Sequence, residues 1–193
     1  MDLIESGTLP GIGSFRCDTC EYQIALAGDD ELPTCPGCGG TGFVRASLFG
    51  KTQFTGRPWP DSDPDDLDWI DEARESLTEP GQYVAFEAPD NRVVAFALRD
   101  WTRIGRSLAA DVRFDDPTVS RRHALIVRQP DGMRVLDDRS LNGVFVNGQR
   151  VEWSPLADGD EILVGCHSLR FFDIAAASPD ARAAGGVSHL LAN

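Results

Sequence analysis

The chain has 193 residues, 41% of them hydrophobic, and a formal net charge of −13. This length allows at most two folded units. No apolar run approaches the roughly 18 residues of a membrane span. The first residues, MDLIE, lack the basic flank and apolar stretch of a signal peptide. We therefore expect a cytoplasmic protein, and the acidic charge argues against long-range attraction to nucleic acid.

Residues 14–49 carry four cysteines in two pairs. Cys17 and Cys20 form one CxxC pair, Cys35 and Cys38 form the second, and fourteen residues separate the pairs. Each pair can offer two thiolates from one tight turn, and a short hairpin can bring both turns together around a tetrahedral Zn²⁺ ion. A unit this small buries too little apolar surface to be stable alone, so bound metal would supply folding free energy.

Two other uses of these cysteines stay open. Disulfides would suit a secreted protein, which nothing else in the sequence indicates. Iron, as in rubredoxins, uses the same CPxCG turn, although Glu21 rather than Gly follows the first pair. The segment resembles a zinc ribbon, and this resemblance implies a fold and a structural zinc but no particular activity. The fifth cysteine, Cys166, has no partner in the sequence, so we expect a small core residue.

Residues 50–80 are expected to form an acidic linker that contains one short helix. Asp63 suits the N-cap, Pro64 suits the first helical position, and Pro80 ends the helix. The apolar side of this helix is thin and would lean on a neighbouring domain. That side consists of Leu67, Ile70, Arg74 and Leu77.

Residues 81–174 show many short apolar segments separated by turn residues, which is typical of a β-sandwich. The expected strands are Tyr83–Glu87, Arg92–Phe96, Asp111–Phe114, Ala124–Arg128, Met133–Asp137, Val144–Val146, Arg150–Trp153, Glu161–Val164 and Ser168–Phe172. Asn147-Gly148 gives the strongest short hairpin signal. Residues 175–193, rich in Ala, Gly and Ser, are expected to be a disordered tail. The fold class is therefore mainly β.

Three short segments carry groups suited to holding a phosphate dianion. A planar guanidinium fork with hydroxyl and amide donors, placed on loops of a rigid scaffold, binds phosphate well. The segments are Gly105-Arg106, Ser120-Arg121-Arg122-His123 and Ser140-Leu141-Asn142-Gly143. Their order and spacing, followed by Asp158-Gly159-Asp160 and Gly165, closely resemble the forkhead-associated (FHA) domain over residues 81–174.

The FHA resemblance implies an eleven-stranded β-sandwich that binds phosphothreonine on loops at one end. It implies that Arg106 clamps the phosphate and that the hydroxyl and amide of Ser120 bind it. Arg121 would lie near the phosphate or the peptide backbone, and Asn142 would hold the peptide main chain. Leu141 stands where some members have a threonine, so it can offer only its backbone.

The resemblance also implies that His123 is structural and braces the binding loop. A nucleophile–base pair of Ser120 and His123 is the rival interpretation, but the sequence shows no orienting third group or oxyanion loop for it. No segment outside the two modules is long enough to hold a catalytic site. We therefore expect a protein that is not an enzyme.

The sequence as a whole predicts a bacterial adaptor that docks on threonine-phosphorylated partners in Ser/Thr kinase signalling. The alternative is a nucleic-acid-associated or regulatory subunit in which the ribbon docks and the FHA domain recruits a phosphorylated partner. Thr52 and Thr55 lie in the linker, so a kinase that modified either would let the domain bind its own chain at high effective concentration.

Overall fold

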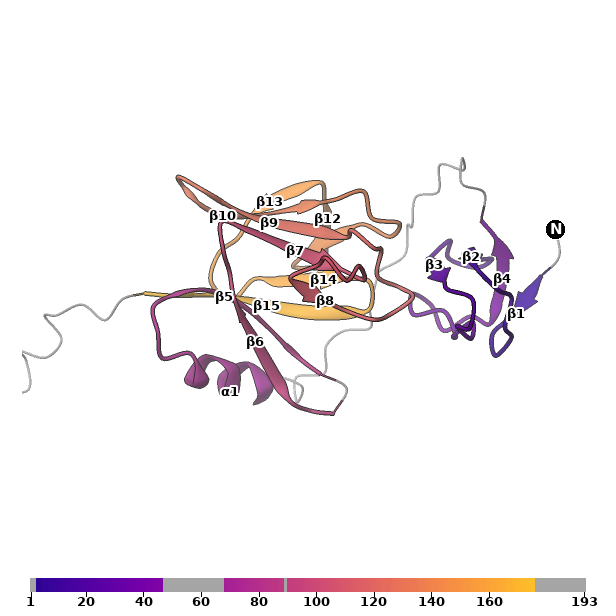
Figure 1. Cartoon of the computed structure of the whole chain (residues 1–193), viewed down its shortest axis with the longest axis horizontal. Helices are drawn as coiled ribbons and strands as arrows, with labels where there is room; N and C mark the ends of the chain where they lie inside the picture. Colours follow the sequence, from indigo (N-terminus) through magenta and orange to yellow (C-terminus); the bar gives the residue numbers. More distant parts are fainter. Residues whose placement is uncertain (1–2, 47–67, 89, 176–193) are drawn as a thin grey trace, which may run out of the picture.

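The computed structural model describes residues 3–46, 68–88 and 90–175, which form a small N-terminal sheet and a two-sheet sandwich (Figure 1). The expected N-cap at Asp63, the linker threonines Thr52 and Thr55, and nearly all of the expected tail lie outside the described residues. The one helix within the described ranges is too short to cross a membrane.

The N-terminal sheet has four strands in the order β1-β4-β2-β3, so β3 is an edge strand. The strands are β1 (Ile4–Glu5), β2 (Gly13–Cys17), β3 (Gln23–Leu26) and β4 (Gly42–Arg45). Phe15, Ile24 and Phe43 point from three of these strands into one small core, where each is 0% exposed. β1 precedes the expected unit of residues 14–49, whose boundaries remain a prediction.

The sandwich consists of a five-stranded and a six-stranded sheet, which together contain the eleven strands that the FHA resemblance implies. The first sheet runs β13 (Trp153–Pro155), β10 (Gly132–Asp137), β9 (Ala124–Gln129), β7 (Trp101–Gly105) and β8 (Val112–Arg113). The second runs β12 (Gln149–Val151), β11 (Val144–Val146), β14 (Glu161–Val164), β15 (His167–Ile174), β5 (Gly81–Glu87) and β6 (Val93–Ala97). The mainly β fold class is thus confirmed.

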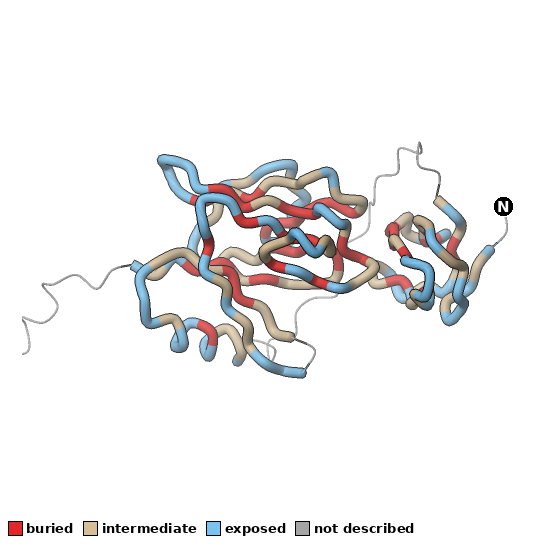
Figure 2. The backbone as a smooth tube through the Cα atoms, viewed as in Figure 1, coloured by how far each residue is buried: buried red, intermediate tan, exposed pale blue. Residues whose placement is uncertain are grey.

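Alternating side chains of both sheets fill the layer between them. On β11 and β14, Val144, Ile162 and Val164 face this layer, and each is 0% exposed. Along β10 the buried Met133 and Val135 alternate with more exposed neighbours, and the burial map shows buried residues concentrated inside the sandwich (Figure 2). The sandwich core therefore follows from the period-two pattern that predicts the strands.

Two strands differ from the sequence prediction. The sequence does not predict β7, because its alternation is inverted in residue type: the polar Thr102 is 0% exposed, whereas the apolar Trp101 is 62% exposed. The expected strand Arg150–Trp153 is instead divided at Glu152, where the chain passes from the six-stranded sheet to the five-stranded one. A change of sheet leaves no local mark in the sequence, since both halves keep extended backbone.

The helix α1 (Asp68–Ser76) packs on the outer side of the six-stranded sheet, next to β5 and β6 (Figure 1). Its buried residue is Ala73, which is 0% exposed and clusters with Ala85 and Phe172. Arg74 lies over the Phe172 ring at 4.8 Å and pairs with Asp158 at 2.9 Å. The helix therefore leans on the sandwich, as the sequence predicts for a neighbouring domain.

Replacing Ala73 with Asp should lower the free energy of unfolding by about 1–3 kcal/mol, because the new carboxylate must either be desolvated or push the helix off the sheet. Urea unfolding measures this change. The matched control is Asp71→Glu on the exposed side of the same helix, which should change little. Equal stability of both variants would show that α1 does not dock in solution.

Candidate functional site

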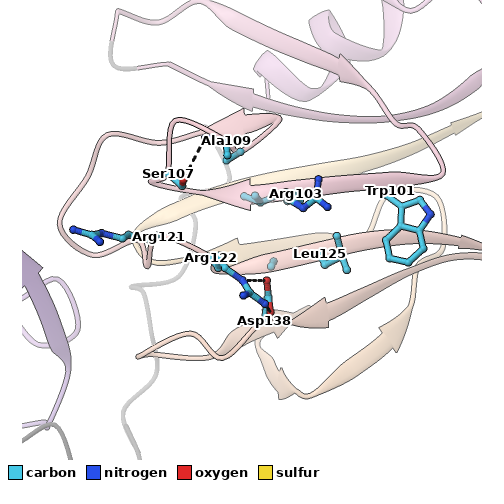
Figure 3. A pocket seen from close by; sticks show the side chains of 11 residues that line it. Trp101, Arg103, Ser107, Ala109, Arg121, Arg122, Leu125 and Asp138 are labelled. Carbon is cyan, nitrogen blue, oxygen red and sulfur yellow. Dashed lines mark hydrogen bonds and ion pairs between the residues drawn. The ribbon is translucent and has the colours of Figure 1, made fainter.

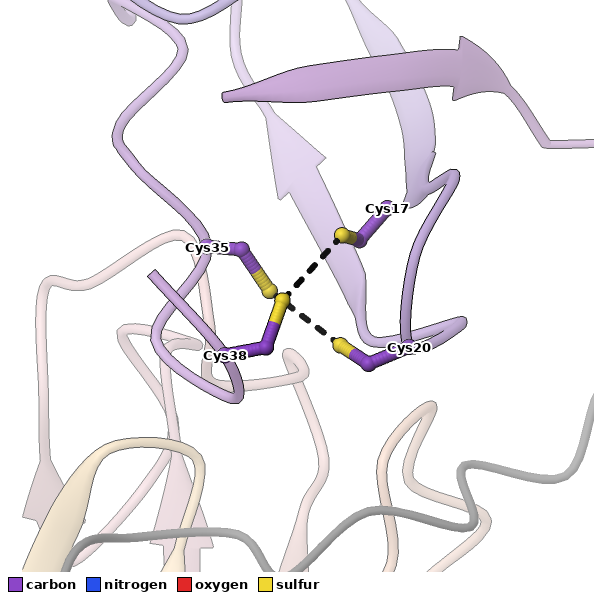
Figure 4. A group of neighbouring side chains, drawn as sticks. All are labelled: Cys17, Cys20, Cys35 and Cys38. Carbon is purple, nitrogen blue, oxygen red and sulfur yellow. Dashed lines mark hydrogen bonds between the residues drawn. The ribbon is translucent and has the colours of Figure 1, made fainter. Parts of the chain in front are cut away.

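The four paired cysteines converge in the N-terminal unit (Figure 4). Cys17 Sγ lies 3.6 Å from Cys38 Sγ, Cys20 Sγ lies 3.4 Å from Cys35 Sγ, and all four sulfur atoms lie within 4.8 Å of one another. A disulfide needs about 2.05 Å, whereas a tetrahedron with metal–sulfur bonds of about 2.3 Å has edges of about 3.8 Å. The donor set and its spacing therefore fit a four-coordinate metal ion.

Each cysteine pair lies in its own turn, and the two turns have the same backbone conformation. The N–H of Glu21 donates to the carbonyl of Cys17 at 3.1 Å, and the N–H of Gly39 donates to that of Cys35 at 2.7 Å. Glu21 and Gly39 both adopt the left-handed region, with φ of 66° and 72°. The carboxylate of Glu21 pairs with Arg16 at 2.8 Å, which helps to hold this residue in place. Glu21 thus adopts the backbone conformation that glycine adopts after the second pair. The absence of a glycine after the first pair therefore does not favour zinc over iron.

Two of the four thiols lose their protons less readily than an ordinary cysteine thiol. Burial raises the pKa of the Cys20 thiol to about 11 and also raises that of Cys35. Metal binding requires thiolates, so a bound cation must displace these protons. Metal affinity should therefore fall as the pH falls.

The loops expected to bind phosphate meet at one end of the sandwich. Arg106 follows β7, and its N–H donates to the carbonyl of Ser120 at 2.9 Å. The N–H of Leu141 donates to Ser120 Oγ at 3.0 Å. A Cβ on Gly105 would clash with the carbonyl oxygen of Arg121, so glycine allows the backbones of these two loops to touch. Long-range packing thus brings together the residues that the motif predicts.

His123 sits beneath these loops as a neutral, fully buried imidazole. Its Nδ1 accepts from the N–H of Ser120 at 3.1 Å, and its Nε2 lies 3.1 Å from the carbonyl of Gly143, to which it donates in this tautomer. Burial lowers its pKa to about 4. The ring bonds the amide of Ser120 and not the hydroxyl, so this geometry does not form a nucleophile–base pair.

The cations of the loops differ in their partners. Arg122 forms two hydrogen bonds with Asp138, at 2.8 and 2.6 Å. Arg121 instead extends from its loop away from this pair (Figure 3). Arg121 is exposed and borders two recesses, one along the sandwich toward Trp101 and one between the loops and the N-terminal unit. Arg121 is therefore accessible to a ligand at these loops.

Two of the expected binding residues are covered. Asn142 is 2% exposed, and the side chain of Arg106 is 16% exposed. The N-terminal unit contributes to the cover of both, through main-chain groups of β3 and through Asp30. The sequence contains no signal for this arrangement, because the contacting residues lie in different modules.

The structure also contains an ion pair that the sequence did not indicate. His167 Nε2 lies 3.6 Å from Asp116 Oδ2, and the His167 ring stacks on Phe114 at 4.3 Å. Burial alone would lower the pKa of His167, but the carboxylate of Asp116 raises it to about 9. Cys166, expected in the core, is only half-buried, and its thiol faces the same carboxylate at 3.6 Å.

Comparison with known proteins identifies both modules. Residues 102–165 match the FHA domain, and residues 1–47 match a zinc-ribbon containing domain. The oxoglutarate dehydrogenase inhibitor of Corynebacterium jeikeium is 38% identical over 100 residues, which span 51% of this chain and 69% of that protein. The chain belongs to the FHA-domain family.

Two further matches cover half of this chain or less. The ABC transporter ATP-binding/permease protein Rv1747 of Mycobacterium tuberculosis is 44% identical over 71 residues, which are 37% of this chain but only 8% of that protein. The solved FHA-1 domain of Rv1747 is 29% identical, with a TM-score of 0.43, and the match covers 50% of this chain and 98% of that domain. The matches of residues 102–165 and 1–47 confirm the FHA and zinc-ribbon assignments made from the motifs, and the relatives from Corynebacterium and Mycobacterium are bacterial.

His167 should make the protein less stable at alkaline pH. Its folded pKa of about 9 lies above the ordinary value of 6.5, so the stabilisation is fully present below pH 6.5 and is lost as the pH rises through 9. We expect the free energy of unfolding to fall by about 1–3 kcal/mol over this window. Urea titrations at several pH values measure the slope.

The control for this prediction is His167→Phe, which keeps an aromatic ring against Phe114 but cannot be charged. This variant should lose most of the alkaline slope. An unchanged slope would mean that the pair with Asp116 contributes no pH-dependent stability.

Proposed function

We propose that this protein is a cytoplasmic, phosphothreonine-dependent adaptor in bacterial Ser/Thr kinase signalling, and that it binds its partners without catalysing a reaction. The observation that supports this most is the meeting of Arg106, Ser120 and Arg121 on loops tied by direct hydrogen bonds. A guanidinium, a hydroxyl and a second cation on a rigid scaffold suit a phosphate dianion. The FHA domain supplies that scaffold.

Each loop residue has a role in this proposal. Arg106 holds the phosphate through its guanidinium fork. The N–H of Ser120 already donates to His123, so the hydroxyl is the group left to donate to the phosphate. The N–H of Leu141 donates to that hydroxyl oxygen, so Leu141 orients Ser120 and does not itself bind phosphate. Asn142 holds the peptide main chain.

The zinc ribbon is proposed to be a structural module. Its four thiolates close a tetrahedral site and leave no open position for a substrate. Zn²⁺ bound by Cys17, Cys20, Cys35 and Cys38 would fix both turns and hence the sheet. The relatives' names describe an enzyme inhibitor and a transporter, and we propose neither target for this chain.

Arg106→Ala should weaken binding of a phosphothreonine peptide by about 30- to 1000-fold, which corresponds to about 2–4 kcal/mol for a charge-assisted contact at a central position. Arg106→Lys should restore only part of the affinity, because an ammonium lacks the planar fork. Calorimetry on the full chain, with unmodified peptide as the reference, measures both.

The matched control is Arg92→Ala, which removes the same charge from an exposed hairpin residue that pairs only locally with Asp90. This variant should bind normally. If Arg106→Ala binds the phosphothreonine peptide as tightly as Arg92→Ala does, the sandwich does not bind phosphate at these loops.

Elemental analysis should find about one zinc per chain, since four cysteines make one closed site. Cys35→Ser should lose the metal and unfold the N-terminal sheet, because the sheet is too small to be stable without it. Cys166→Ser should keep the metal, since Cys166 lies outside the four-cysteine cluster. Bound iron, which colours the protein, or a metal-free chain with an ordered N-terminal sheet, would contradict the zinc assignment.

A further inference from the structure

The outer edge of β3 lies against the loops that the proposed function assigns to the phosphopeptide. Oδ1 of Asn142 accepts from the N–H of Gln23 at 2.8 Å, and Nδ2 of Asn142 donates to the carbonyl of Gln23 at 2.7 Å. Both polar atoms of this side-chain amide thus bind the main chain of one residue. This is the contact that the proposed function reserves for the main chain of a bound peptide.

A second main-chain bond continues the contact along the same edge. The N–H of Ala25 donates to the carbonyl of Pro117 at 2.9 Å. Gln23 and Ala25 are two residues apart, so their outward amides lie on the same edge of the strand. β3 therefore lies on the loops as an extended segment, in the manner of an added strand.

A carboxylate from the loop after β3 reaches the phosphate-binding arginine. Asp30 Oδ2 lies 3.5 Å from the Arg106 guanidinium. The same oxygen accepts from the N–H of Ala27 at 2.6 Å, so the loop itself holds the carboxylate in position. An aspartate is the nearest unmodified side chain to a phosphate in charge, although it carries one charge where the phosphate carries nearly two.

An apolar contact away from the phosphate loops anchors this arrangement. Phe145 of β11 and Leu163 of β14 are paired neighbours on the outer face of the six-stranded sheet. Both belong to the same buried cluster as Tyr22, Ile24 and Leu26 of the N-terminal unit, and they are 7% and 8% exposed. Figure 1 shows the N-terminal sheet beyond one end of the sandwich.

We infer that the N-terminal unit is a built-in competitor for the phosphopeptide, in which β3 occupies the peptide main-chain position and Asp30 occupies part of the phosphate position. This inference rests on the proposed function. A phosphorylated partner must displace β3 from Asn142 before it can use that side chain. The apparent affinity of the full chain is then the intrinsic affinity reduced by the fraction of molecules with the N-terminal unit undocked.

Leu163→Asp tests the inference without altering the phosphate loops. The new charge disfavours docking, whereas the sandwich core is preserved because Leu163 faces away from it. The probe is a fluorescent peptide library with degenerate residues around one phosphothreonine, titrated against the full metal-bound chain by polarisation. We expect Leu163→Asp to bind about tenfold or more tightly than the unmodified protein.

A matched pair of loop variants tests the carboxylate. Asp30→Asn and Asp29→Asn each remove one acidic charge from the same loop, but only Asp30 reaches Arg106. We expect about threefold tighter binding for Asp30→Asn and little change for Asp29→Asn, because long-range repulsion of the phosphate is relieved equally in both. Equal effects of the two variants would overturn the role of Asp30.

Hydrogen exchange followed by NMR supplies an independent measurement. The amides of Gln23 and Ala25 should exchange faster in Leu163→Asp, and also when phosphopeptide is added to the unmodified protein, whereas the β2 amides within the sheet should not change. Unchanged exchange at both positions on peptide binding would overturn the displacement of β3.

The affinities separate this inference from the function on which it rests. If the unmodified protein, Leu163→Asp and Asp30→Asn bind equally and Arg106→Ala does not bind, the phosphopeptide function holds and the competitor is excluded. If Leu163→Asp binds more weakly, the N-terminal unit contributes to the site and does not block it. If no variant prefers phosphorylated peptide, the proposed function fails and the inference fails with it.

Discussion

The buried imidazole of His123 joins the loops on which the rest of the binding end depends. Its two ring nitrogens contact the loop of Ser120 and the backbone of Gly143, while its own main chain bonds Ile104 and Asp138. Because the ring is 0% exposed and neutral, these bonds are made without a buried charge. The positions of these loops are therefore set by polar contacts inside the sandwich.

The N-terminal unit depends on a different constraint. Its sheet has only four short strands, and its outer strand β3 exposes amides that need partners. The four-cysteine cluster lies in the turns at one side of this sheet, and the sandwich loops supply partners for Gln23 and Ala25 on the other. The cysteine cluster and the candidate peptide-binding loops are thereby linked through one strand.

Charge is distributed to favour local recognition over long-range attraction. The chain is strongly acidic, yet residues 81–174 hold twelve arginines against fourteen acidic side chains. At the binding loops Asp138 fully engages Arg122, Asp30 approaches Arg106 at a longer distance, and Arg121 is exposed. Arg106 and Arg121, the two cations proposed to meet the phosphate, are thus less neutralised by the protein than Arg122 is.

The sequence by itself determined the features that depend on neighbouring residues. Cysteine spacing predicts the two cysteine-bearing turns, a period-two pattern predicts strands such as Gly132–Asp137, and the loop motifs predict the FHA family together with the residues that gather at one end of the sandwich. Each of these follows from backbone geometry or from a motif that occupies contiguous positions.

Only the tertiary structure decided the features that join distant segments. The change of sheet at Glu152, the pair between Asp116 and His167, and the contact between Asn142 and Gln23 have no local pattern. The physical reason is that these groups find partners through packing, and a polar side chain buried by a distant segment looks in sequence like one left exposed to solvent. The sequence therefore predicted the residues that gather at one end of the sandwich, whereas the fold decided that the N-terminal unit covers two of them, Arg106 and Asn142.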